Sequence, residues 1–282
     1  MTVARLDQRF AALKREGRAG FVAYVMAGDP DADASLRVLE GLPAAGADIV
    51  ELGFPFSDPM ADGPAIQRAA VRALAGGMTL AGTLGLARRF RQGDQTTPLV
   101  LMGYLNPILA YDLERFAADA AGAGVDGVIL VDCPPEEAEP VLAAFDPVGL
   151  ALIRLATPTT DDARLPTVVR RTSGFVYYVS VAGVTGGKAA DADAVAPAVA
   201  RVRKASGLPV AVGFGIRDPD SAAAVARHAD ASVVGSAIID RIAQGLDADG
   251  KPGPALIDEV LGFVGSLAAG VRGARAQADA VQ

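Results

Sequence analysis

Residues that carry redox, metal and nucleophilic chemistry are scarce in this sequence. Cys133 is the only cysteine and His228 the only histidine among 282 residues. A disulfide framework, a metal site built from several histidines and cysteines, and most nucleophile–histidine pairs are therefore excluded. Acid–base chemistry must fall to aspartate, glutamate, tyrosine or lysine. We predict no metal site, and we expect Cys133 in the core or a loop and His228 at the surface or a helix end.

Clusters of positive charge and long apolar runs are also missing. The net charge is −7, and no group of basic residues alternates with aromatic ones, so the sequence predicts no nucleic-acid partner. Glycine, proline or charge interrupts every apolar stretch before it reaches membrane-spanning length, so no membrane partner is predicted either. Near the amino terminus Leu6, Phe10 and Leu13 fall at helical spacing, where an export signal would have an apolar core. We expect an amphipathic helix there and a cytoplasmic protein.

Hydrophobic residues make up 51% of the chain and charged residues 21%, which is enough for one large core. Short runs rich in valine, isoleucine and leucine alternate with longer alanine-rich amphipathic segments, a pattern typical of parallel strands covered by helices. Eight such strands in a chain of this length fit a closed (β/α)8 TIM barrel better than an open doubly wound sheet. The expected strands are residues 21–26, 48–53, 99–104, 127–132, 150–156, 175–180, 209–214 and 231–235.

The segments between these strands complete the predicted α/β fold. Residues 65–92 carry two helical pieces separated at Gly76-Gly77, which predicts an insertion after the second strand and not a new domain. No linker of distinct composition divides the chain, so residues 1–282 are expected to form a single barrel domain with an extra amino-terminal helix. The other expected helices are residues 33–45, 108–121, 135–145, 162–171, 191–205 and 218–229.

Residues 51–64 are the most informative segment. Glu51 alternates with Val50 and Leu52 in a predicted strand, so its side chain points to the other face, toward a pocket. Burial disfavours a charged carboxylate, so the pKa of Glu51 should be raised, as a general acid requires. Asp62 follows in a proline-stiffened loop that is longer than an ordinary connection. The two carboxylates predict an acid–base site. The alternative is that Glu51 pairs with an arginine and Asp62 only forms a turn.

Glycines mark the ends of the later strands. Gly213 and Gly215 follow the seventh predicted strand, and Gly235 and Ser236 follow the eighth, each ahead of a helical segment. Glycines let backbone N–H groups approach phosphate oxygens, and a helix start adds unpaired donors and a favourable dipole end. We predict a phosphate site, with close packing of strand against helix as the alternative. The glycine-rich loop 182–188 is either a lid or only a flexible connection.

With these motifs the chain resembles the tryptophan synthase alpha chain family over nearly its whole length. Residues 51–64 look like the long and highly specific signature of that family. Three positions depart from the family pattern, Met26, Cys133 and Arg217, and only Arg217 bears on a site, the phosphate contacts. The shorter matching motifs are Ala-Gly-Asp-Pro at 27–30, Tyr-Leu-Asn-Pro at 104–107, Asp-Cys-Pro-Pro-Glu at 132–136, Gly-Val-Thr-Gly at 183–186, Gly-Phe-Gly-Ile at 213–216 and Gly-Ser at 235–236.

The resemblance implies a lyase of tryptophan biosynthesis that cleaves indole-3-glycerol phosphate to indole and glyceraldehyde 3-phosphate by a retro-aldol reaction. It implies that Glu51 transfers protons at the ring carbon and the hydroxyl, and that Asp62 binds the indole N–H. Tyr177, on the interior side of the sixth strand, is implied to orient Glu51 or the hydroxyl, with core packing as the alternative. Thr185 and Gly186 would close over the substrate. The residues implied for the phosphate are Gly186, Gly213, Gly215, Gly235 and Ser236, and the walls of the indole pocket are expected among Ile66, Leu101, Met102 and Phe214.

The resemblance also implies a partner. Family members work with a beta chain in an α2β2 heterotetramer, in which the beta chain holds pyridoxal phosphate and receives the indole, so no cofactor is expected on this chain. The partner contacts implied are Pro55, Asp58 and Asn106, with residues 134–135 as a further contact. The alternative for the prolines is simple stiffening of the loops.

Two other functions stay open from the sequence. One is a different phosphate-binding barrel enzyme of indole metabolism. The lysine expected at an early strand end for indole-glycerol phosphate synthesis is not visible, because no lysine lies between Lys14 and Lys188. The other is a non-catalytic subunit that regulates a partner enzyme, and the presence of both Glu51 and Asp62 argues against it.

Overall fold

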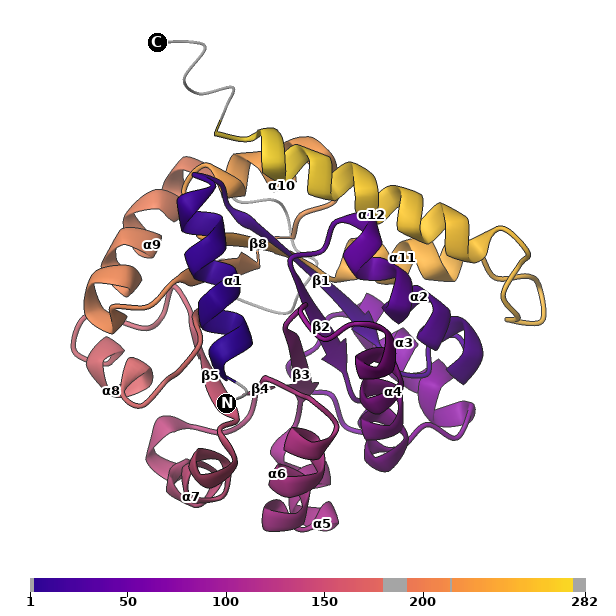
Figure 1. Cartoon of the computed structure of the whole chain (residues 1–282), viewed down its shortest axis with the longest axis horizontal. Coiled ribbons are helices and arrows are strands. Elements are labelled where there is room, and N and C mark those ends of the chain that lie inside the picture. Colours follow the sequence, from indigo (N-terminus) through magenta and orange to yellow (C-terminus); the bar gives the residue numbers. More distant parts are fainter. Residues whose placement is uncertain (1–2, 180–191, 214, 276–282) are drawn as a thin grey trace.

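The computed structural model describes residues 3–179, 192–213 and 215–275. Eight parallel strands pair in chain order and close into a barrel, which confirms the predicted fold (Figure 1). Each strand begins and ends within two residues of its expected bounds. The strands are β1 Gly20–Met26, β2 Ile49–Gly53, β3 Leu99–Gly103, β4 Gly127–Leu130, β5 Ala151–Ala156, β6 Val176–Val179, β7 Val210–Gly213 and β8 Ala231–Val234.

Helices cover the outside of the barrel, and short polar caps decide where several of them begin and end. Asp31 accepts the Ala34 N–H at the start of α2, and Gly46 ends that helix in the left-handed conformation, with φ 112°. Asp218 and Ser221 form a capping box at the start of α10. The helices are α1 Val3–Arg15, α2 Ala32–Ala45, α3 Pro64–Ala75, α4 Leu80–Gly93, α5 Leu105–Tyr111, α6 Leu113–Gly122, α7 Glu139–Phe145, α8 Leu165–Val169, α9 Ala192–Ser206, α10 Pro219–Ala226, α11 Ser236–Gln244 and α12 Leu256–Gly273.

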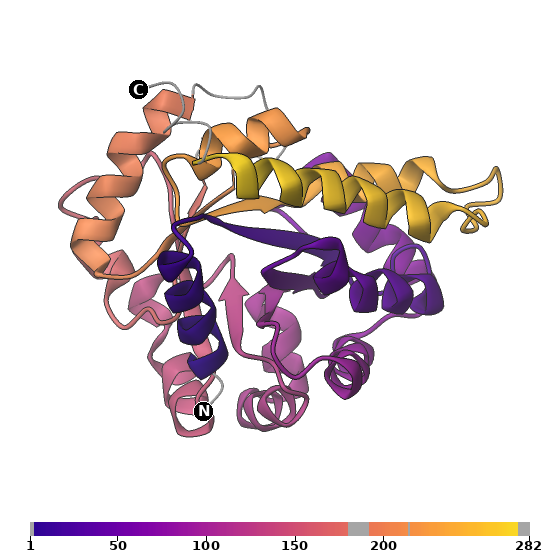
Figure 2. The same ribbon diagram turned by 45° about the horizontal axis from the view of Figure 1, so that its top comes forward.

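Several helix predictions need correction. The single helix expected at 108–121 is two helices, because Asp112 takes φ 80° between α5 and α6 and its carboxylate caps α6 by accepting the Arg115 N–H. The helix expected at 162–171 shrinks to α8, since the turn that precedes it is held by the Asp161 carboxylate on the Arg164 N–H. The long α12 was not predicted. In Figure 2 it runs in yellow alongside α10 and α11, against which it packs.

The barrel interior is filled by one side of each strand. The apolar side chains on that side form a cluster that also contains Leu6, Phe10 and Leu13 of α1. Figure 1 shows α1 lying across one end of the barrel. The amphipathic helix predicted at the amino terminus is therefore confirmed. It covers the amino-terminal ends of the strands and leaves the carboxyl-terminal ends for the site.

Ion pairs hold the amino-terminal end of the barrel together, with buried carboxylates at Asp48 and Asp126 and a partly exposed one at Asp230. Three aspartates, each just before an even-numbered strand, accept a backbone N–H from the neighbouring odd-numbered strand and bind arginine. Paired in this way a carboxylate tolerates burial, because its hydrogen bonds replace those lost from water. The three sets are Asp48 with Phe21 N–H and Arg18, Asp126 with Leu99 N–H, Arg5 and Arg91, and Asp230 with Val210 N–H and Arg203.

The insertion predicted after the second strand is confirmed as α3, which precedes the crossover helix α4. Gly77, with φ +80°, lies in the turn between the two helices.

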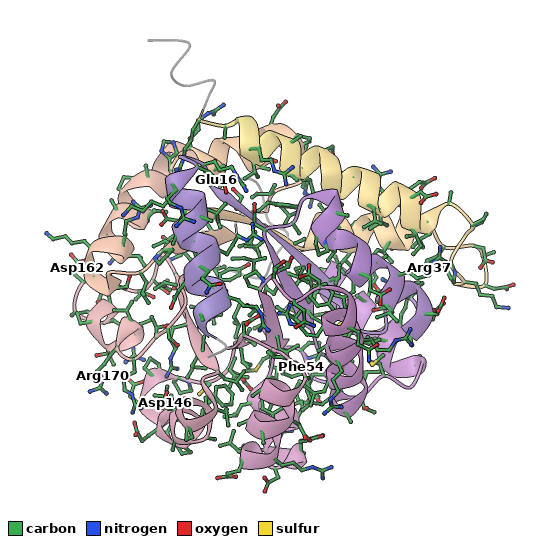
Figure 3. The ribbon with its side chains drawn as sticks, in the orientation of Figure 1. Glu16, Arg37, Phe54, Asp146, Asp162 and Arg170 are labelled. Atoms are coloured by element: carbon green, nitrogen blue, oxygen red, sulfur yellow. The ribbon has the colours of Figure 1, made fainter. Side chains whose placement is uncertain are left out.

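Within the described ranges, no single helix is both long and apolar enough to span a membrane, and the bent pair of α3 and α4, at 96°, meets that test only when its helices are taken together. Figure 3 shows Phe54, at the start of the loop before α3, among the interior side chains, whereas Arg37 and Asp162 lie at the periphery.

Candidate active site

Glu51 lies in the middle of β2 with its side chain in the barrel interior. Its residue surface is 1% exposed. Both of its carboxylate oxygens are buried without a hydrogen-bond partner among the described residues, so the alternative of an arginine pair finds no support there. Burial raises the pKa of Glu51 to about 8, and the negative charge of Asp62 adds to the shift. The raised pKa matches the expectation from the sequence, and Glu51 carries a proton at neutral pH.

Asp62 lies in the loop between β2 and α3 and is also buried. Burial raises its pKa to about 6, while a hydrogen bond from the Tyr104 hydroxyl opposes the rise. The same hydroxyl accepts the backbone N–H of Ala61 at 3.0 Å, and Gln67 donates to the Asp62 carbonyl at 2.9 Å. Asp62 is thus ionised at neutral pH and held on both its side chain and its backbone.

The two carboxylates share one region of low polarity and hold different protonation states there. The charge of Asp62 raises the pKa of Glu51, because two like charges in a poorly solvated region disfavour each other. Near pH 7 the pair therefore holds one proton, on Glu51. One group is a proton donor and the other an anion, which is the arrangement that acid–base chemistry on a neutral heterocycle requires.

Tyr24 is a site residue that the sequence analysis missed. It lies on β1 opposite Glu51 in the strand register, and burial together with the charges of Asp62 and Glu51 raises its pKa. A Cβ at Gly53 would lie 2.2 Å from the Tyr24 hydroxyl, so only glycine leaves room for this ring. Alternation from Val22 along β1 points Tyr24 inward and is the signal that would have found it.

Tyr177 lies on β6 and packs against the barrel-interior cluster, so its predicted inward orientation is confirmed. Burial and the charge of Glu51 raise its pKa. A Cβ at Gly213 would lie 2.5 Å from the Tyr177 hydroxyl. Gly213 on β7 therefore sets the position of this tyrosine.

The glycines predicted to bind phosphate have a packing role as well. Gly213 leaves room for Tyr177, and a Cβ at Gly235 would lie 3.2 Å from the Tyr24 ring. The alternative of close packing is therefore confirmed for Gly213 and Gly235, but these glycines pack against tyrosine side chains and not against a helix. Gly215 takes the left-handed conformation, with φ 62°, and α11 begins at Ser236 after the N-cap residue Gly235, which makes no side-chain cap. Phosphate binding here stays a prediction.

Three predicted binding residues, Thr185, Gly186 and Phe214, lie outside the described residues, as does the predicted lid loop. Of the expected walls of the indole pocket, Met102 packs against the barrel interior. Leu101 as a wall is wrong, because strand alternation turns it into the helix-facing core. Ile66 is buried in that same core on α3, and its contact with substrate stays a prediction.

The predicted partner contacts differ in their exposure to solvent. Asp58 and Asn106 are exposed. Pro55 is buried, so a direct partner contact through its side chain is not supported, and it stiffens the loop from inside. Two large apolar side chains of the same segments are exposed, Met60 at 77% and Leu109 at 55%. Exposed apolar groups of this size are typical of binding surfaces.

The expectations for the single cysteine and histidine are confirmed. Cys133 is buried in the loop after β4, and His228 lies in the turn that follows α10. Among the residues that the structure describes, no group of three or more histidine, cysteine, aspartate or glutamate side chains is placed to hold a metal ion.

Comparison with known proteins agrees with this geometry. A sequence model described as tryptophan synthase alpha chain matches residues 10–259. The tryptophan synthase alpha chain of Phenylobacterium zucineum (strain HLK1) is 67% identical over 281 residues, covering 100% of both chains. That of Caulobacter vibrioides (strain NA1000 / CB15N) is 68% identical over 275 residues, covering 98% of both.

Solved structures give the same result. The structure of tryptophan synthase subunit alpha from Legionella pneumophila strain Paris matches with a TM-score of 0.86 and 38% identity, covering 95% of this chain and 98% of that one. A structure of Mycobacterium tuberculosis tryptophan synthase matches with a TM-score of 0.85 and 37% identity, with coverage of 95% and 98%.

Proposed function

The chain belongs to the tryptophan synthase alpha chain family, whose members serve tryptophan biosynthesis, and we propose that it cleaves indole-3-glycerol phosphate to indole and glyceraldehyde 3-phosphate. In this retro-aldol reaction the bond between indole C3 and the side-chain carbon breaks. The ring carbon gains a proton, and the neighbouring hydroxyl loses one to become the aldehyde. The observation that carries the proposal is the pair of buried carboxyls, Glu51 protonated and Asp62 ionised at neutral pH.

Glu51 is suited to the proton transfers. With a pKa of about 8 it holds a proton at pH 7 and can deliver it to indole C3. The carboxylate that this leaves is a base in a buried site and takes the proton of the side-chain hydroxyl as the carbon–carbon bond breaks. Glu51 thus returns to its acid form, and protons balance over the cycle.

Asp62 is suited to stabilise the cation formed when the ring is protonated. Its carboxylate would accept the indole N–H, and in a buried site this electrostatic contribution is larger than in water. The hydrogen bond from Tyr104 works in the same direction, because it lowers the pKa of Asp62 and keeps the group ionised.

The two interior tyrosines complete the proposed site. Tyr177 would orient Glu51 or the substrate hydroxyl, since it packs against the barrel interior and the charge of Glu51 raises its pKa. Tyr24, which lies beside Glu51 in the register of β1 and β2, would form an aromatic wall near both carboxyls. Phosphate would bind at the backbone of Gly215 and at Ser236, where α11 begins after an N-cap glycine that makes no side-chain cap. Gly186, Gly213 and Gly235 are proposed to share that role, and Thr185 and Gly186 are proposed to close over the substrate.

We also propose that the chain works in the cytoplasm as an α2β2 heterotetramer with a tryptophan synthase beta chain, which would hold the pyridoxal phosphate. Asp58 and Asn106 are the exposed contacts that we assign to the partner. Tyr104 supports a link between docking and activity. It precedes α5, which carries Asn106, and its hydroxyl holds Ala61 and Asp62. A partner that tightens this contact would fix the Asp62 carboxylate.

Product analysis tests the proposal. The purified chain is incubated with indole-3-glycerol phosphate, with and without a beta chain, and released indole is measured. We expect indole in both cases and more of it with the partner. Glu51→Gln should lower kcat by about 10²–10⁴, the usual contribution of a general acid–base group. Glu40→Gln, on the exposed surface of α2, is the matched control. Indole release by Glu51→Gln equal to that of the control would remove Glu51 from the reaction.

A further inference from the structure

One pocket of the structure lies between the loops that follow β4 and β5. Its volume is about 430 Å³, and neither Glu51 nor Asp62 lines it. Volumes of this size suit small molecules. The residues used below come from its wall: Asp132, Arg154, Thr157, Thr159, Thr160 and Arg164.

Arg154 is the unusual residue of this pocket. It lies on β5 between Ile153 and Leu155, whose side chains pack into the barrel interior, so Arg154 points out of the barrel. Its residue surface is only 5% exposed. Nη1 donates to the Cys133 carbonyl at 3.1 Å. Nε is buried without an acceptor, and the guanidinium has no carboxylate partner across the part of the chain that the structure describes.

The unused side of this guanidinium is the one that binds oxyanions best. Nε–H and one Nη–H point the same way, and together they match the two oxygens of a carboxylate. The same protein uses that arrangement at Arg72, whose Nε and Nη2 donate to the two Asp29 oxygens at 2.6 and 2.9 Å. Arg154 lines the pocket, and its Nε has no acceptor and its guanidinium no carboxylate partner among the described residues.

The other polar and charged groups of the pocket wall determine which ligand charge the pocket favours. Thr157, Thr159 and Thr160 place hydroxyls beside the pocket, where Thr157 and Thr160 also bond to each other. At the rim Arg164 is paired with Glu136, and Asp132 adds a second carboxylate. Because Arg164 neutralises Glu136, the uncompensated charges at this wall are those of Arg154 and Asp132. The Asp132 carboxylate repels a dianion such as phosphate more strongly than it repels a single negative charge.

We propose that this pocket binds a small monocarboxylate, which accepts hydrogen bonds from Nε and Nη2 of Arg154. The site is separate from the proposed indole and phosphate sites and does not depend on their assignment. The ligand carboxylate supplies the acceptor that a buried guanidinium donor requires. Thr157, Thr159 and Thr160 line the same pocket and would contact the rest of the ligand.

Nuclear magnetic resonance on the full chain tests this directly. A buried arginine N–H gives an observable signal, and Arg154→Lys identifies the Arg154 Nε–H by its loss. Acetate is titrated in the millimolar range, with chloride exchanged for acetate at constant ionic strength. We expect the Arg154 Nε–H and the amides of Thr157 and Thr160 to follow one saturating curve. Arg170→Lys, an exposed arginine just after α8, is the matched control and should respond as the wild type does.

Four results would overturn the proposal. These are no saturable shift with acetate in the wild type, an unchanged response of the threonine amides in Arg154→Lys, and an equal or stronger response to inorganic phosphate. The fourth comes from adding a beta chain. If that chain alone moved the Arg154 signal and abolished the acetate response, the acceptor would be a partner side chain and not a small molecule. Retention of the acetate response in the presence of the beta chain supports the assignment.

Discussion

Replacing Glu51 with glutamine should change how the stability of this protein depends on pH. In the folded chain, burial and the charge of Asp62 raise the pKa of Glu51 from 4.5 to about 8. In the unfolded chain the carboxyl ionises near its ordinary value. Between these two values the folded state holds a proton that the unfolded state has released. The free energy of unfolding therefore falls as pH rises through this window.

The size of the effect follows from the two pKa values. One proton gives a slope of about 1.4 kcal/mol per pH unit. Over the window up to pH 7 the loss is about 3 kcal/mol, and at pH 8 and above it approaches about 5 kcal/mol. Glutamine has nearly the same shape and no charge, so it removes this slope. Its buried amide shifts stability by an amount that does not vary with pH, which makes the slope the diagnostic quantity.

Urea unfolding followed by circular dichroism, repeated from about pH 5 to about pH 8, measures this slope. The difference between Glu51→Gln and the wild type should grow by about 1.4 kcal/mol per pH unit in favour of the variant. Glu40→Gln is the control, because its exposed carboxyl lies on the surface of α2. Asp62→Asn should act in a lower window, since burial raises the pKa of Asp62 from 3.8 to about 6.

Parallel stability curves for Glu51→Gln and the wild type across this range would refute the reasoning. They would mean that Glu51 is ionised in the folded protein, and it could then not be the proton donor to the ring. If the slope persisted in Glu51→Gln and vanished in Asp62→Asn, the proton would be on Asp62 and not on Glu51.

Three further predictions follow from contacts around the site and at the opposite end of the barrel. Tyr104→Phe removes a hydrogen bond that lowers the pKa of Asp62, so the acidic limb of kcat/KM against pH should move up by about 1 pH unit; an unmoved limb would contradict the contact. Gly213→Ala should lower kcat by displacing the Tyr177 hydroxyl, 2.5 Å from the new methyl group, and adding Tyr177→Phe should cost no further activity; independent, multiplicative losses would speak against this steric link. Asp126→Asn leaves two arginines without their buried partner and should cost about 3–5 kcal/mol in urea unfolding with kcat unchanged; a loss of kcat at full stability would contradict a purely structural role.

The barrel was predictable because its signals are local. Each strand is a short apolar run, and alternation along β2 already turned Glu51 away from Val50 and Leu52. The same rule excludes Leu101 as a wall of the indole pocket. Helix ends were less certain, since a single residue such as Asp112 with positive φ divides one amphipathic segment into two helices.

The contacts between segments were not predictable in this way. The hydrogen bond from Tyr104 to Asp62 joins the end of β3 to the loop after β2. The approach of Tyr24 to Gly53 joins two strands. Neither leaves a periodic trace in the sequence, because the partners lie far apart along the chain and meet only once the barrel has closed.

The amino-acid sequence by itself therefore determined the barrel, the inward orientation of Glu51 and the presence of a second carboxylate in the loop that follows it. Burial in a strand already predicted a raised pKa for Glu51. Only the tertiary structure decided that Asp62 stays ionised beside it, since that depends on how completely each carboxyl is removed from water and on the hydrogen bond from Tyr104. The same holds for Arg154, whose guanidinium becomes notable only because the folded chain buries it without a carboxylate among the described residues.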